Sequence, residues 1–76
     1  MSEEILRKVQ DILYSKLGKV VADSTIRVNC QRMGIKQEDL SKENLTLFAE
    51  NIKVSLMLFL GDKEIKELLE DIKKID

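Results

Sequence analysis

The stretch KENLTLFAENIKVSLMLFL, residues 42–60, decides the fold of this chain. Its apolar residues recur at the three- and four-residue spacing of an α-helix. A second apolar line, made of Leu47, Val54 and Leu58, lies off that main stripe. A helix that is apolar on two sides needs cover on both, so we expect this helix to occupy the centre of an assembly. The main stripe consists of Leu45, Phe48, Ile52, Leu56 and Phe59, with Ala49 and Leu60 alongside.

Glycines divide the rest of the chain around this segment. The sequence has no proline, and its three glycines fall at positions 18, 34 and 61. Glycine adopts the left-handed conformation cheaply, so we expect each one to end a helix. With Ser41 and Asp62 as N-caps, the predicted helices cover residues 2–17, 19–33, 42–60 and 63–75.

Short connections join these segments, which favours antiparallel packing of neighbouring helices. The six residues after Gly34 predict a connector whose two apolar side chains, Ile35 and Leu40, fold back on the core. The sequence therefore predicts an all-α fold, a compact antiparallel bundle of four helices in a single domain spanning residues 1–76.

Composition limits the functions worth considering. Thirteen basic and 14 acidic residues give a net charge of −1, so no overall basic field attracts nucleic acid or anionic lipid. The absence of histidine and the single cysteine exclude the usual zinc sites, and we expect no metal and no cofactor. An acidic N-terminus and short apolar runs favour a cytoplasmic protein without a membrane segment.

The chain is so small that association with a second protein could contribute to its stability. Folding removes roughly 8,000 Å² from water, and its apolar part contributes on the order of 120 kcal/mol. Ordering the chain costs on the order of 115 kcal/mol. Because these terms nearly cancel, we expect a homodimer, or a complex with another helical protein, whose contact surface contains Leu47, Val54, Met57 and Leu58. The alternative is that neighbouring helices cover these residues within one chain.

Enzymatic activity is not expected, because histidine is absent and no phosphate-binding or nucleophile motif is present. The carboxylates of residues 63–75 alternate with lysines at ion-pair spacing, which is typical of a solvated helix face. Cys30 lies in line with Ala22 and Ile26, so we interpret it as a small core residue. Alternatively, Arg27 and Arg32 could activate an exposed Cys30 thiol as a redox site.

The basic segment from Lys16 to Lys36 supplies a second hypothesis. Arg27, Arg32 and Lys36 could contact phosphates there, and residues 26–40 resemble the opening of a helix-turn-helix DNA-binding unit. The helix that follows Ser41 departs from that unit because it soon becomes strongly apolar. We therefore expect a non-enzymatic protein interaction or regulatory module that self-associates, with a nucleic-acid-binding regulator as the alternative.

Overall fold

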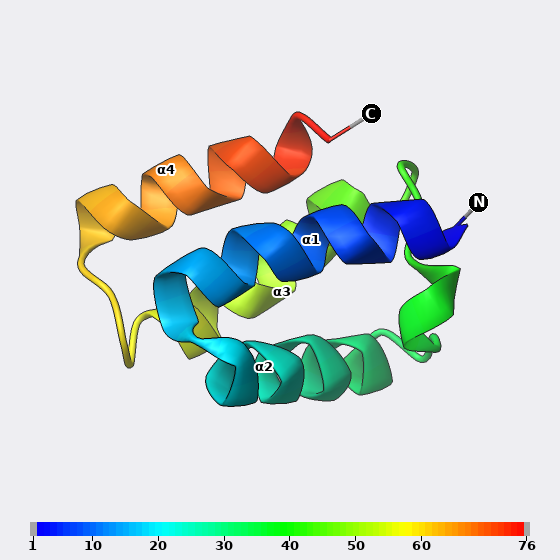
Figure 1. The fold of residues 1–76 in the computed structure, drawn as a ribbon, viewed down its shortest axis with the longest axis horizontal. Helices are drawn as coiled ribbons and strands as arrows, with labels where there is room; N and C mark the ends of the chain where they lie inside the picture. The colour runs from blue at the N-terminus through cyan, green and yellow to red at the C-terminus, as the bar shows by residue number, and fades with distance from the viewer. Residues whose placement is uncertain (1, 76) are drawn as a thin grey trace.

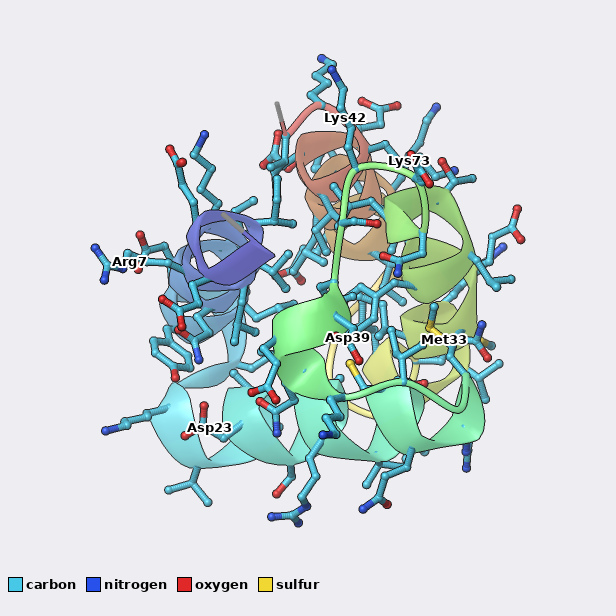
Figure 2. All side chains as sticks on the ribbon, turned by 90° about the vertical axis from the view of Figure 1, so that its right-hand side faces the viewer. Arg7, Asp23, Met33, Asp39, Lys42 and Lys73 are labelled. Atoms are coloured by element: carbon cyan, nitrogen blue, oxygen red, sulfur yellow. The ribbon has the colours of Figure 1, made fainter. Side chains whose placement is uncertain are left out.

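Four α-helices and one short 3-10 helix form most of residues 2–75, the part of the chain that the computed structural model describes. The α-helices are α1 (Ser2–Leu17), α2 (Lys19–Arg32), α3 (Leu45–Leu56) and α4 (Asp62–Lys73), and the 3-10 helix is η1 (Gln37–Asp39). The chain direction reverses from each α-helix to the next (Figure 1), and α2 lies oblique to the other three (Figure 2). The predicted all-α bundle of four helices is confirmed.

In the view of Figure 2, α1, α4 and α3 are seen roughly end-on, while α2 runs across beneath α1 and α3. Helix α1 contacts α2 and α4, and α3 contacts the same two helices from the other side. The helix expected at the centre is therefore a peripheral helix. One side of α3 faces solvent because no element of the described chain packs over it.

The core lies between the four helices and confirms most of the main apolar stripe predicted for residues 42–60, since Leu45, Phe48, Ile52 and Leu56 are buried. The connector also behaves as predicted, since Leu40 is fully buried and Ile35 packs against the core. The 3-10 helix η1 contacts α1 and α2 and closes that end of the bundle. The buried apolar residues are Val9, Leu13, Ala22, Ile26, Cys30, Leu40, Leu45, Phe48, Ala49, Ile52, Leu56, Ile65, Leu68, Ile72 and Ile75.

Two of the three glycines adopt the conformation that the sequence predicts. Gly18 has a φ of 80° and is the single residue between α1 and α2, while Gly34 has a φ of 73° after the end of α2. Gly61 differs, because its φ of −79° and ψ of 167° are extended. It serves as the N-cap of α4 in place of the predicted Asp62, and α4 begins one residue early.

Helix α3 is shorter than residues 42–60 at both ends. At its start, the backbone N–H of Ser41 donates to Asn44 Oδ1 at 2.8 Å, and Asn44 Nδ2 donates to the carbonyl of Asp39 at 3.1 Å. These bonds hold residues 41–44 as a turn. Asn44 is therefore the N-cap, and the prediction of Ser41 in that role is wrong.

At the other end of α3, the backbone tightens into a turn. The N–H groups of Leu58 and Phe59 donate to the carbonyls of Ser55 and Leu56, at 3.3 Å and 2.9 Å. Such bonds between residues three apart rotate the chain out of α-helical register. Phe59, predicted on the core stripe, consequently has 55% of its surface exposed.

A side-chain hydrogen bond joins the first two helices. The Tyr14 hydroxyl donates to Asp23 Oδ1 at 2.5 Å across the α1–α2 contact. This bond is the main cause that raises the pKa of Tyr14, because it favours the protonated phenol. Asp23 therefore bonds to α1, and the other charged side chains of α2 are all basic.

Candidate functional site

All four residues predicted to form a contact surface lie at the protein surface. Leu47, Val54, Met57 and Leu58 expose 53%, 65%, 61% and 81% of their surface. The alternative, that neighbouring helices cover them within one chain, is therefore wrong. These residues stay exposed because α3 contacts only α2 and α4 among the described helices, which leaves its outer side open.

Three further exposed apolar residues were missed by the sequence analysis. Val20 and Val28 on α2 expose 81% and 37% of their surface, and Phe59 follows the end of α3. The signal for the two valines was present, since both lie beside the stripe of Ala22 and Ile26 that forms the core face of α2. Phe59 carried no such signal, because its exposure depends on where the helix ends.

A groove between α2 and the end of α3 brings most of these residues together. It has a volume of about 270 Å³, and its lining holds no ionisable side chain. We call it the α2–α3 groove. Apolar side chains form one part of its lining, namely Val20, Val21, Val28, Leu58 and Phe59, and hydroxyl-bearing Ser24, Thr25 and Ser55 form the rest.

Met57 belongs to a different groove. This second groove, the α3–α4 groove, has a volume of about 560 Å³ and lies between the end of α3 and the length of α4. Its apolar residues are Met57, Ile65 and Leu69, and three lysines and two carboxylates complete it. The predicted contact surface is therefore divided, with Met57 on one side of the turn after α3 and Leu58 on the other.

A polar pair, buried Asn29 and half-buried Ser55, joins α2 to α3 next to the α2–α3 groove. Asn29, which is fully buried, donates from Nδ2 to the Thr25 carbonyl at 2.7 Å and to Ser55 Oγ at 3.4 Å. Within residues 2–75, no group donates a hydrogen bond to Asn29 Oδ1. A buried acceptor without a donor costs free energy, so this contact is a weak point in an otherwise apolar seam.

The basic residues of the nucleic-acid hypothesis do not gather on one surface. Arg27, Arg32 and Lys36 are all exposed. Arg27 and Arg32 are five residues apart on α2, which places them roughly 140° apart around the helix axis. Lys36 follows the helix, and its backbone N–H donates to Asp39 Oδ2 at 3.2 Å, so a carboxylate lies beside it. Asp39 is on η1 at the end of the bundle (Figure 2).

Cys30 is a free thiol in the core, with 1% of its surface exposed. Burial raises the pKa of this thiol to about 11, because the low-dielectric interior disfavours the thiolate. Neither arginine nearby in sequence lowers that pKa. The arrangement is that of a structural cysteine.

Two kinds of site are absent from the described part of the chain. No cluster of three acidic or cysteine side chains within residues 2–75 could hold a metal ion. None of the helices in that range combines the length and apolar character needed to cross a bilayer. The chain matches no protein-family model, and it matches no curated protein and no solved structure with significance.

Proposed function

We propose that this protein is a non-enzymatic interaction module that forms a homodimer through one apolar surface of α2 and α3. We call this surface the α2–α3 face. The observation that carries the proposal is the exposure of six large apolar side chains along one side of the bundle. These residues are Val20, Val28, Leu47, Val54, Leu58 and Phe59.

Helix spacing and the groove place these residues in two groups. Leu47 and Val54 are seven residues apart on α3, which places them in one line along the helix, and Leu58 lies in the turn that follows the same helix. Val20 and Val28 lie beside Leu58 and Phe59 because all four line the α2–α3 groove.

The size of the face fits a dimer contact. A fully exposed apolar side chain of this kind presents roughly 60–120 Å². Scaled by their exposed fractions, the six residues present on the order of 300 Å². This area is roughly two thirds of the apolar area that each partner contributes to a standard interface. Apolar patches of this size on soluble domains are often functional.

The shape and charge of the face favour a second copy as its partner. A twofold interface must be complementary to itself, so a projection on one chain must fit a recess on the other. The turn that carries Leu58 and Phe59 projects beside the α2–α3 groove (Figure 1). Two copies could exchange these contacts, and the uncharged lining avoids the cost of burying an ionised group.

Sedimentation equilibrium tests this proposal. We expect the wild type to be a dimer, and we expect Leu58→Glu to be a monomer that keeps its helicity by circular dichroism. The matched control is Met57→Glu, which places the same charge one residue earlier but in the α3–α4 groove. We expect this control to remain a dimer. A monomeric wild type, or an equal loss of dimer in both variants, would contradict the proposal.

A further inference from the structure

The α3–α4 groove is the larger of the two grooves, and the proposed dimer does not use it. Its floor is apolar, since Ile65 is buried, Leu69 is half-buried and Met57 has 61% of its surface exposed. On α4 its lining runs from Asp62 to Lys73, the full 12 residues of that helix, so it offers a track of roughly 18 Å along α4. A track of that length accommodates about three turns of a docked helix.

Lysines stand on both walls of this groove. Lys53 projects from α3, and Lys66 and Lys73 project from α4. Lys73 lies on the outside of the bundle between the two helices (Figure 2). Lys66 and Lys73 are seven residues apart, which separates them by about 10.5 Å along α4.

These three ammonium groups are not neutralised by partners in the chain. All three lysines are exposed, and within residues 2–75 none of them has an ion pair or a side-chain hydrogen bond. The two carboxylates of the groove, Asp62 and Glu70, make no ion pair either. Asp62 lies in the first turn of α4, where the helix dipole already stabilises it. Lysines thus outnumber carboxylates along the walls.

We propose that the α3–α4 groove binds an acidic amphipathic helix of another protein. Such a helix would lay its apolar stripe on Met57, Ile65 and Leu69, as helix-in-groove complexes do. Acidic residues flanking that stripe would face Lys53 on one wall and the two lysines of α4 on the other. Two acids that are seven residues apart on the docked helix would match the spacing of Lys66 and Lys73.

The proposal stands apart from the dimer, because the two surfaces lie on opposite sides of the turn after α3. The dimer would then present two such grooves to helical partners. If the partner also carries two linked helices, the second helix binds within a complex that has already formed. This would strengthen the complex without any new contact.

The probe for this groove is a fluorescein-labelled helical peptide with a leucine stripe flanked on both sides by glutamates. Titration in 25 mM salt should show binding by fluorescence anisotropy, and the amide resonances of Ile65 and Leu69 should shift in the NMR spectrum. A second peptide with lysine in place of every glutamate should bind at least about tenfold more weakly. Raising the salt to 300 mM should remove most of this difference.

Variants of α4 locate the site. We expect Lys66→Glu with Lys73→Glu to weaken binding of the glutamate peptide at least about tenfold. The matched control is Lys63→Glu with Lys74→Glu, which makes the same charge change at an exposed position of α4 and at its exposed C-cap, neither of which lines the groove. This control should bind the glutamate peptide within about twofold of the wild type.

Three results would overturn the proposal: equal binding of both peptides, equal weakening by both double variants, or resonance shifts confined to the α2–α3 face. Binding of decanoate in the groove without binding of the peptide would also overturn it, in favour of an anionic amphiphile. Leu58→Glu separates the two proposals, because it should abolish the dimer and leave peptide binding intact.

Discussion

Met57 and Leu58 are consecutive residues, yet Met57 lines the α3–α4 groove and Leu58 lines the α2–α3 groove. The turn that ends α3 produces this separation, because its two side chains leave the backbone toward opposite neighbours. One short turn therefore contributes to both surfaces that we propose for binding.

If the dimer uses the whole α2–α3 face, a change on α2 should disrupt it as Leu58→Glu does. We expect Val20→Glu to weaken the dimer at least about tenfold, since Val20 lies in the same groove as Leu58 and has 81% of its surface exposed. Sedimentation equilibrium measures this change, and Lys19→Glu is the neighbouring exposed control. A dimer that survives Val20→Glu but not Leu58→Glu would confine the interface to α3.

The buried amide of α2 predicts an unusual gain in stability. We expect Asn29→Leu to raise the free energy of unfolding by about 1 kcal/mol, because it removes an acceptor that has no donor. The Thr25 carbonyl keeps its helical partner, and Ser55 is half-buried and can bond to water. Urea unfolding measures the difference. Ser55→Ala should change the free energy of unfolding by less than about 0.5 kcal/mol. A loss of stability in Asn29→Leu would show that the amide of Asn29 is needed.

Gly18 and Gly61 are both N-caps, but they predict opposite responses to the same substitution. Gly61→Ser should stabilise the bundle by about 0.5 kcal/mol, because its extended backbone suits a serine cap. Gly18→Ser should destabilise it by about 1 kcal/mol, because a φ of 80° strains a residue with a Cβ. Thermal unfolding compares the stability of the two variants with that of the wild type. If both variants were more stable, or both less stable, the backbone conformations of the two glycines would be wrongly assigned.

Cys30 should be inert in the folded protein. With a thiol pKa of about 11, only about one molecule in a thousand carries the thiolate at pH 8, and the side chain is buried. We expect Ellman's reagent to label nothing until denaturant is added. Gln31→Cys in a Cys30→Ala background is the exposed neighbouring control and should react within minutes. Rapid labelling of the wild type would support the redox hypothesis instead.

The same thiol predicts how stability depends on pH. Its folded-state pKa lies above its ordinary value, so the folded state favours the protonated form. The resulting stabilisation is complete below the unfolded pKa, near 9, and is lost as the pH rises toward 11. Cys30→Ala should lose less stability across this window than the wild type does, as urea unfolding at each pH would show.

The nucleic-acid hypothesis predicts that the protein binds duplex DNA and that this binding weakens with salt. The placement of the basic residues argues against this hypothesis. Arg27 and Arg32 point in different directions, and Lys36 lies beside Asp39. We expect no binding to a fluorescent 20-base-pair duplex in 25 mM salt. Binding that weakens steeply with salt and is lost in Arg27→Ala with Arg32→Ala would establish that hypothesis in place of ours.

Local patterns predicted the helices and the core well, because apolar spacing within a helix needs no knowledge of its neighbours. Ile26, Leu45, Phe48 and Ile52 are buried as their stripes predict. The spacing could not show whether the second apolar line of α3 is covered or how far that helix extends. The first depends on which helices pack against α3, and the second depends on hydrogen bonds with other segments, such as those of Asn44 with Asp39 and Ser41.

Phe59 was missed for a related physical reason. Its exposure follows from where α3 ends, which depends on the hydrogen bonds that Leu58 and Phe59 donate to Ser55 and Leu56. The sequence pattern also could not decide the role of Gly61. A glycine after an apolar run can end one helix or cap the start of the next, and Gly61 is the N-cap of α4.

The position of the chain ends has a practical consequence. Helix α1 begins and α4 ends at the same end of a bundle 31 Å long, while the turn with Leu58 lies at the other end (Figure 1). A fluorescent protein or an affinity tag fused ahead of α1 would therefore extend away from Leu58, whereas one fused after α4 would lie next to Lys73 and the α3–α4 groove. Energy transfer between copies tagged ahead of α1 could then report assembly in living cells without covering the turn that carries Leu58.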